Sequence, residues 1–328
     1  MNRRDFLKRG SFAAAAGMLA SHGLSIARAQ EKQTYYMVTF VSGISYWADA
    51  FRGMKDAADY LGVEAIYTGT PDQDATAEVR VLEETLGLQP DGVVLTVIQA
   101  DALKPSIDAA IDNGIPLVTF DADSPLSKRY SFLGTGNYFA GVIAGRYIGS
   151  LVPSGKAAVI TNPEQNNLQQ RVQGFTDTLA AEFPGVVTGP EFIVNNQNTS
   201  ELAASGLAAL LQADPDIKGV FSSNAQAAIG AAAALREAGL SADVQHIGFD
   251  FDEGTLDLID NGELGATLAQ GTWQMGFWGM LNVYMVRNSM IKSVSDWQAA
   301  GISPLPPNVD TGVVVINKDN SKFWRAPK

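Results

Sequence analysis

Short apolar segments alternate with longer stretches of helical periodicity from about residue 34 to the end of the chain. The apolar segments are continuous rather than interleaved with polar residues, as expected of strands that are buried on both faces of a parallel sheet. Several helical stretches end at a glycine, such as Gly62 and Gly239, the residue that most readily adopts the left-handed conformation closing a helix. This pattern predicts an α/β fold in which helices flank parallel sheets.

The predicted elements fall into two successive sets. In the first set, strands are predicted at residues 35–41, 63–67, 92–95, 115–120 and 131–133, with helices at 46–61, 75–86 and 100–112. In the second set, strands are predicted at 156–160, 186–193, 219–221, 244–248 and 265–269, with helices at 169–182, 200–212, 225–238 and 253–259. A break near residues 130–137 separates the sets and predicts two Rossmann-like lobes. A later helix at 273–290 and a strand at 312–316 indicate that the chain crosses between the lobes again.

Residues 1–29 have the features of a processing signal rather than of a folded element. Arg3 and Arg4 open a twin-arginine export pattern, and a weakly apolar segment at 11–25 leads to an A-x-A cleavage site at 27–29. The apolar segment is shorter than the roughly 20 residues that span a bilayer. We therefore expect a signal peptide at 1–29, export by the twin-arginine route, and a periplasmic mature protein.

Composition and charge exclude several classes of function. The chain has no cysteine and only two histidines, which excludes thiol chemistry and gives little basis for a histidine metal centre. The net charge is −12, and removal of residues 1–29, with five basic and one acidic residue, makes it −16. This charge disfavours nucleic-acid binding. Without a cysteine for lipid attachment, we expect the mature protein to diffuse freely. We also expect a monomer.

The carboxyl ends of the predicted strands carry most of the candidate chemistry, because ligands of open parallel sheets bind beyond those ends. They supply carboxylates, amides, hydroxyls and aromatic rings, but neither a base paired with a nucleophile nor a basic cradle for phosphate. This set suits a sugar, whose hydroxyls both donate and accept while its C–H faces pack on aromatic rings. The candidates at strand ends are Tyr46, Trp47, Thr96, Asp121, Asp123, Asn224, Asp250, Gln270 and Trp273.

Each candidate also has an ordinary structural interpretation. A single Ser, Asn or Asp after a strand is more often the N-cap of the next helix than a ligand-binding residue. Tyr46 and Trp47, taken alone, are more often core aromatics than ligand platforms. The ligand site is favoured because so many independent strand ends carry polar groups of the same chemical kind.

Seven segments, in this order, resemble the periplasmic sugar-binding proteins of the ribose/galactose type, which are the solute receptors of ABC importers. They are Tyr46-Trp47, residues 116–121, 134–137, 170–175, 220–224 and 247–250, and Ala269-Gln270. The resemblance covers about residues 34–316. It implies the type I periplasmic binding protein fold, with three hinge crossings between a lobe of residues 33–135 plus 271–309 and a lobe of residues 136–270 plus 310–328.

The resemblance also implies a site, a partner and no cofactor. Tyr46 and Trp47 would flank the sugar, and Trp273 would add a second stacking face. The hydroxyls would be bound by Asp121, Arg171, Asn224, Asp250 and Gln270. The implied ligand is a neutral monosaccharide or polyol, held without catalysis. The implied partner is the permease of an ABC importer, and a chemoreceptor is a second candidate partner.

Three positions depart from the ribose-type pattern. Thr96 stands where ribose-type members present an amide, Ile44 stands in place of an asparagine, and Ala122 stands in place of an arginine. These departures favour a monosaccharide other than ribose, a deoxy sugar or a polyol, with Asp123 taking part of the lost polar role.

The main alternative is an exported cofactor oxidoreductase, which the twin-arginine signal and the α/β pattern also suit. Residues 134–139 approach a dinucleotide-binding fingerprint, but Phe139 occupies the place of the third glycine. A transcription regulator with the same core would need DNA-binding helices where the export signal lies. A glycosidase could use Asp121 and Asp250 as its carboxylate pair. A calcium site at 250–253 would not meet the EF-hand spacing.

Overall fold

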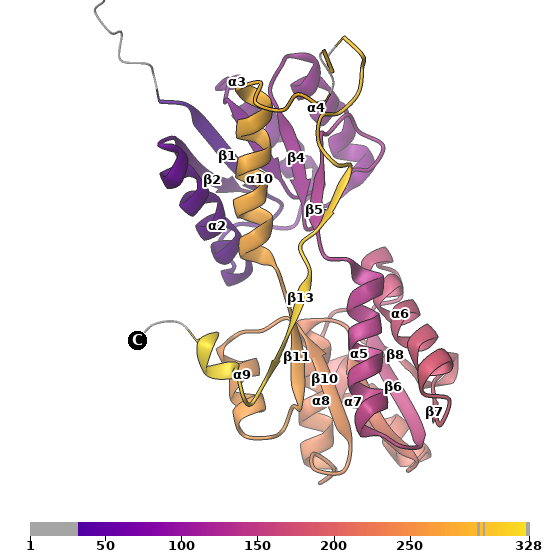
Figure 1. Cartoon of the computed structure of the whole chain (residues 1–328). Helices are drawn as coiled ribbons and strands as arrows, with labels where there is room; N and C mark the ends of the chain where they lie inside the picture. Colours follow the sequence, from indigo (N-terminus) through magenta and orange to yellow (C-terminus); the bar gives the residue numbers. More distant parts are fainter. Residues whose placement is uncertain (1–31, 294–295, 298, 326–328) are drawn as a thin grey trace, which may run out of the picture. The chain divides into compact units, whose positions relative to one another are not determined.

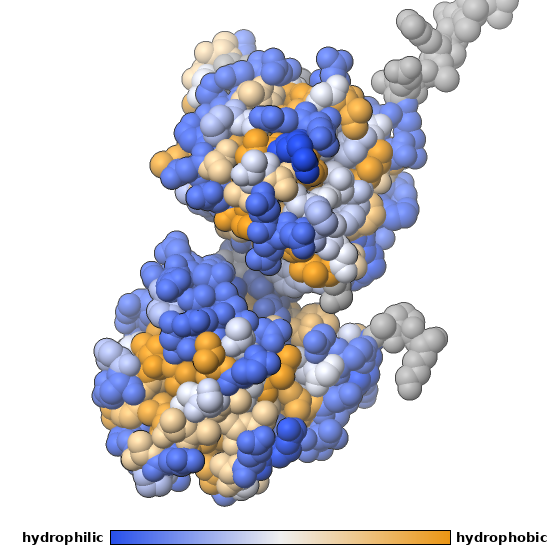
Figure 2. Space-filling model, turned by 180° about the vertical axis from the view of Figure 1, so that it is seen from behind, coloured by the Kyte–Doolittle hydropathy of each residue, from blue (hydrophilic) through white to orange (hydrophobic). Residues whose placement is uncertain are grey.

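The computed structural model describes residues 32–293, 296–297 and 299–325. The expected signal peptide at residues 1–29 lies outside the described residues. Within the described part of the chain, no helix is both long enough and apolar enough to span a bilayer. Figure 2 shows polar residues over much of one face, with apolar side chains in groups between them.

The first sheet has six parallel strands in the order β12-β5-β4-β3-β1-β2. The strands are β1 (Thr34–Thr39), β2 (Glu64–Gly69), β3 (Gly92–Leu95), β4 (Leu117–Phe120), β5 (Phe132–Gly134) and β12 (Asn308–Asp310). Helices α2 (Ser45–Leu61) and α10 (Thr272–Arg287) cover one face, and α3 (Ala75–Gly87) and α4 (Ala100–Asp112) cover the other (Figure 1). Strands β3 and β4 are buried at every position, which explains their continuous apolar sequences.

The second sheet has seven strands, and only β13 runs antiparallel. The strands are β6 (Gly155–Thr161), β7 (Val186–Val187), β8 (Ile193–Asn195), β9 (Ile217–Ser222), β10 (Gln245–Phe249), β11 (Ala266–Gln270) and β13 (Val313–Asn317). Their order is β13-β11-β10-β9-β6-β7, and β8 also pairs with β6. The α-helices around this sheet are α5 (Asn137–Leu151), α6 (Asn166–Glu182), α7 (Ser200–Ala213), α8 (Ala225–Glu237) and α9 (Glu253–Asp260). Two 3₁₀ turns, η1 (Pro190–Phe192) and η2 (Ser321–Phe323), complete it. Helices α5 and α6 pack on one face, and α7 and α8 pack on the other.

Three short segments carry the chain from one sheet to the other. The first joins β5 to α5, the second joins β11 to α10, and the third joins β12 to β13. Hydrogen bonds connect these joining segments: Thr311 N donates to Gly134 O at 2.9 Å, and Gly136 N donates to Asp310 Oδ1 at 2.8 Å.

The predicted fold class, two sets of mostly parallel strands flanked by helices, is confirmed. The strand predicted over 186–193 is wrong in its middle, because Gly189 and Pro190 introduce η1 between β7 and β8. Helix α5 and strand β12 were not among the predicted elements. Helix α5 contains Gly141, Gly145 and Gly149, which weaken its helical signal, and β12 has only three residues.

The glycines of α5 and α6 let these two helices approach closely. A Cβ at Gly141 would lie 2.0 Å from the carbonyl oxygen of Arg171 in α6, and a Cβ at Gly174 would lie 2.0 Å from the carbonyl oxygen of Tyr138 in α5. Both neighbours are backbone atoms, so a side chain at either position forces the helices apart.

We expect Gly174→Ala to destabilise the protein by about 1–3 kcal/mol, because the overlap with Tyr138 exceeds the gain in helix propensity. Gly87→Ala is the matched control, because a Cβ at Gly87, in the last position of α3, meets nothing within 4 Å. Urea unfolding of both variants measures the difference. Equal stability of the two variants would show that α5 and α6 tolerate separation.

Candidate functional site

Tyr46 and Asp121 meet at the carboxyl edge of the first sheet. Tyr46 lies in the first turn of α2, and Asp121 directly follows β4. The hydroxyl of Tyr46 donates a 2.6 Å hydrogen bond to Asp121 Oδ1. Burial and the neighbouring carboxylates of Asp121 and Asp250 raise the pKa of Tyr46 well above its usual value, so the phenol stays protonated and acts as a donor.

Asp250, Gln270 and Arg171 form a second polar group around the carboxyl edge of the second sheet. Asp250 follows β10, Gln270 is the last residue of β11, and Arg171 comes from α6. Gln270 Nε2 donates to Asp250 Oδ1 at 2.7 Å, and Arg171 Nη2 donates to Gln270 Oε1 at 3.3 Å.

Arg171 is only 4% exposed, and several neighbouring groups contact its guanidinium. Its Nε donates to Asn137 Oδ1 and its Nη1 donates to the carbonyl oxygen of Ser223, both at 2.8 Å. The guanidinium carbon lies 3.6 Å from the centre of the Phe249 ring, a cation–π contact that replaces part of the lost hydration. Burial nevertheless lowers the pKa of Arg171, and the nearby carboxylates act in the opposite direction.

Asp121 and Asp250 share an unusual backbone conformation in equivalent places. Their φ angles are 61° and 63°, in the left-handed region that costs a non-glycine residue about 1 kcal/mol or more. Each amide donates to the neighbouring strand, Asp121 N to Leu133 O at 3.0 Å and Asp250 N to Leu268 O at 2.8 Å. The two sheets therefore present a carboxylate in the same way, and Asp and Asn are among the residues that tolerate this conformation best.

The two carboxylates influence each other and share one cation. Burial is the largest cause of the raised pKa of both Asp121 and Asp250. The charge of Asp250 raises the pKa of Asp121 further, while Arg171 lowers the pKa of both. Each carboxylate has one oxygen engaged, and within the described part of the chain Asp121 Oδ2 and Asp250 Oδ2 accept no hydrogen bond.

Trp47 and Thr96 are both buried, and Trp47 packs against Tyr46. Trp47 is 2% exposed and its ring meets Phe40, Tyr46 and Phe120 edge-on, with centroid separations of 4.7–5.6 Å. Thr96 directly follows β3 and is fully buried. Neither Trp47 Nε1 nor Thr96 Oγ1 has a hydrogen-bond partner among the residues that the structure describes.

The other three predicted site residues have structural partners elsewhere. Asp123 forms a two-pronged ion pair with Arg129, at 2.5 and 2.6 Å. Trp273 donates from its indole nitrogen to Asp56 at 2.8 Å and stacks on Phe277. Asn224 caps α8 by accepting from Ala227 N at 2.8 Å. Hydrogen bonds join Tyr46 to Asp121 and join Arg171, Gln270 and Asp250, and the charges of these two sets influence one another. Asp123, Trp273 and Asn224 have other contacts.

The residues that position Arg171 and Gln270 were not predicted. Asn137, Ser223 and Phe249 contact Arg171, and Thr135 contacts Gln270. All four lie within segments 134–137, 220–224 and 247–250, which carry the family resemblance, and Ser223 and Phe249 directly precede the predicted Asn224 and Asp250. The sequence therefore marked these segments but not the role of these four residues.

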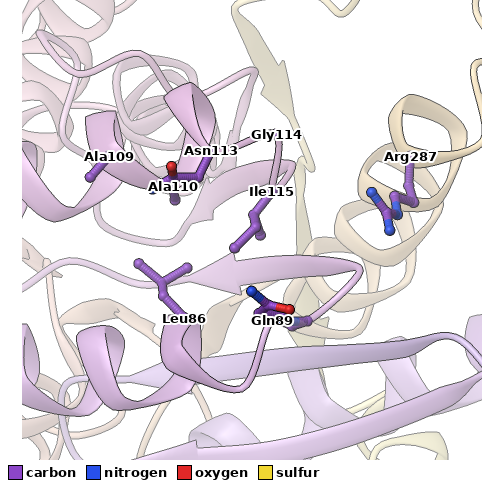
Figure 3. A pocket seen from close by; sticks show the side chains of 9 residues that line it. Leu86, Gln89, Ala109, Ala110, Asn113, Gly114, Ile115 and Arg287 are labelled. Carbon is purple, nitrogen blue, oxygen red and sulfur yellow. The ribbon is translucent and has the colours of Figure 1, made fainter.

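Two other kinds of site come into question, a metal centre and a cavity at the opposite end of the first sheet. Among the described residues, no group of three His, Cys, Asp or Glu side chains could hold a metal ion. A cavity of about 500 Å³ lies where the chain enters β3 and β4, and Figure 3 shows Leu86, Gln89, Asn113 and Ile115 around it. Its charged residue, Arg287, is paired with Asp91 at 2.9 Å.

Comparisons with known proteins bear on this geometry. Residues 35–288 match the periplasmic binding protein domain. The chain is 36% identical to the sugar-binding protein of a sugar ABC transporter from Bacillus halodurans, with a TM-score of 0.86 over 90% of this chain and all of that one. It is also 36% identical to AraP, an arabinose-binding protein from Geobacillus stearothermophilus, with a TM-score of 0.84 and the same coverage. It is 26% identical over 285 residues to the xylose/arabinose-binding protein XylF of Sulfolobus acidocaldarius, 82% of this chain and 67% of that protein.

Glu78 fixes the segment after β3 that carries Thr96. Its side chain is fully buried at the start of α3, and its Oε2 accepts from Ile98 N at 3.0 Å. Burial raises the pKa of Glu78 from 4.5 to about 7. The folded state therefore binds a proton that the unfolded state releases above pH 4.5, and stability falls as the pH rises from about 4.5 through 7.

We expect the free energy of unfolding of Glu78→Gln, relative to that of the parent protein, to increase by about 3 kcal/mol between pH 4.5 and pH 8. Burial lowers the pKa of His246 to about 3, so in both proteins His246 reduces stability as the pH falls below 6.5 and its effect cancels in the difference. Urea unfolding at both pH values measures the change, with Glu84→Gln on the exposed side of α3 as control. A difference that does not vary with pH would contradict the burial effect.

Proposed function

Because the chain belongs to the family of periplasmic binding protein domains, we propose that it captures a neutral monosaccharide or polyol between two lobes and delivers it to an ABC importer. The proposed lobes comprise residues 33–135 plus 271–309 and residues 136–270 plus 310–328. Its named relatives are sugar-binding proteins, one of them part of a sugar ABC transporter. The alternative of an exported oxidoreductase gains no support from them, and we propose binding without catalysis.

The observation that carries this proposal is the matched presentation of Asp121 and Asp250. Each aspartate keeps one oxygen that the described residues leave unengaged, and Arg171 uses three of its five donors on Asn137, Ser223 and Gln270. A polyol can donate hydroxyls to both carboxylates and accept from the guanidinium without bringing a charge into the site. Charge-assisted hydrogen bonds of this kind contribute about 1.5–3 kcal/mol each.

The proposed contacts divide into polar and apolar ones. Asp121, Arg171, Asp250 and Gln270 would bind hydroxyls directly, and Tyr46 would flank the ring while holding Asp121. Trp47 and Thr96 are buried and would shape the floor of the site. The remaining three predicted residues would have to give up their present contacts before they could bind the ligand. These residues are Asn224, Asp123 and Trp273.

Ligand selection would operate by a shift between conformations. A sugar that contacts both lobes stabilises the conformation in which both sets of residues reach it, and the joining segments allow that change. Micromolar affinity corresponds to about −8 kcal/mol, which a handful of charge-assisted bonds supplies after the cost of ordering. The relatives named for arabinose and xylose place pentoses first among ligands to test, with deoxy sugars and polyols next.

The export and partner assignments form a separate part of the proposal. Residues 1–29 would be a twin-arginine signal peptide, and the mature protein would be a freely diffusing periplasmic monomer. Its main partner would be the permease of an ABC importer, with a chemoreceptor as a second partner. Neither nucleic acid nor a cofactor takes part.

We expect Asp250→Asn to weaken binding of the cognate sugar at least 100-fold, because an amide replaces the charged acceptor for a ligand hydroxyl. Asparagine tolerates the left-handed backbone, so the fold remains intact. Titration calorimetry with a panel of pentoses, deoxy sugars and polyols measures the effect. Asp243→Asn, an exposed position just before β10, is the matched control. Unchanged affinity in Asp250→Asn would refute the assignment.

We expect replacement of Arg3 and Arg4 by lysine to block export, because the twin-arginine pathway reads that pair. Cell fractionation would then find the protein in the cytoplasm, whereas the parent chain would appear in the periplasm without residues 1–29. Replacement of Lys8 and Arg9 by the opposite basic residues is the control. Normal export of the lysine-pair variant would assign the signal to another route.

A further inference from the structure

Thr135 lies in the first joining segment, between β5 and α5, and is 7% exposed. Its hydroxyl donates a 2.7 Å hydrogen bond to Oε1 of Gln270, at the start of the second joining segment. We propose that Thr135 is a positioning residue of the sugar site, which fixes the side chain of Gln270 and, through it, the carboxylate of Asp250. This inference rests on the proposed function.

The side-chain amide of Gln270 has a fixed orientation. Arg171 Nη2 donates to Gln270 Oε1 at 3.3 Å, and Gln270 Nε2 donates to Asp250 Oδ1 at 2.7 Å. These two charged partners determine which end of the amide faces which side. The contact with Arg171 is long, so the shorter bond from Thr135 is the one that holds the oxygen end in place.

Anchoring Gln270 matters because Asp250 depends on it. The hydrogen bond from Gln270 lowers the pKa of the Asp250 carboxyl, opposing the effect of burial. It also occupies Oδ1, so that Oδ2 is the oxygen offered to a ligand hydroxyl. When Gln270 is free to move, Asp250 loses its amide partner on the buried side and its orientation toward the ligand.

The backbone around Thr135 is suited to act as an anchor. On one side, Gly134 O accepts from Thr311 N at 2.9 Å, and on the other, Gly136 N donates to Asp310 Oδ1 at 2.8 Å. Both bonds come from residues 310–311, where β12 ends and the third joining segment begins. Threonine is also stiff about χ1, so its hydroxyl is fixed relative to this held backbone.

The test uses Thr135→Val, which keeps the shape of the side chain and removes the hydroxyl. We expect its Kd for the best-binding pentose of the panel, measured by titration calorimetry, to rise about tenfold. Thr135→Ser restores the hydroxyl and should bind within about threefold of the parent protein. Thr311→Val is the matched control in the third joining segment, because Thr311 Oγ1 has no partner among the described residues, and it should leave the Kd unchanged.

A double-mutant cycle with Gln270→Ala separates positioning from general structural damage. If Thr135 acts through Gln270, adding Thr135→Val to Gln270→Ala changes the Kd by less than about twofold. The inference is overturned if Thr135→Val alone binds like the parent, if Thr135→Ser is as weak as Thr135→Val, or if the effect persists undiminished in Gln270→Ala. Thr135→Ala replaces the valine variant if the latter does not fold. Failure of the parent protein to bind any sugar would instead reject the proposed function.

Discussion

Two partly buried carboxylates and one buried guanidinium determine how this site can work. Asp121 and Asp250 raise the free energy of each other's charged form, and burial adds to that effect. Arg171 is the cation that opposes it for both, and the hydroxyl of Tyr46 and the amide of Gln270 each stabilise one of the two. A neutral ligand with several hydroxyls can supply further donors to the carboxylates without adding a charge. An anionic ligand would meet the same carboxylates and be repelled, so the electrostatics of this group disfavour anions.

The placement of Arg171 depends on how closely two helices pack. A Cβ at Gly141 in α5 would overlap the carbonyl oxygen of Arg171, so the absence of a side chain there sets the distance between α5 and α6. Helix α5 begins with Asn137, whose side chain accepts from Arg171 Nε. The glycines of this helix pair therefore serve the site as well as the core, since they bring the guanidinium against both Asn137 and the ring of Phe249.

Much of the fold follows from local sequence, and the failures have local causes. Continuous apolar strands and glycine-ended helices predict two sets of elements and an α/β fold, and the family resemblance implies the type I periplasmic binding protein fold. Both are confirmed. Helix α5 escapes detection because close packing requires glycines that weaken a helical pattern. The sequence also shows which polar residues follow the strands, but it does not show which partners they contact. Asp121 and Asp123 differ by two positions, yet one meets Tyr46 and the other meets Arg129, which only the tertiary structure decides.

The joining segments add a constraint that neither sheet imposes alone. Thr135 contacts Gln270, Gly134 and Gly136 contact residues 310–311, and Thr272 Oγ1 donates to Asp49 in α2 at 2.5 Å. These bonds link the first joining segment to both of the others. The residue at the end of β11 takes part in both systems, since Gln270 contacts Thr135 on one side and Asp250 on the other. Under the proposed function, a ligand that binds Asp250 would therefore act on a group that is hydrogen-bonded, through Gln270, to the segments about which the lobes would turn. Binding and conformation would then share Gln270 as a structural element.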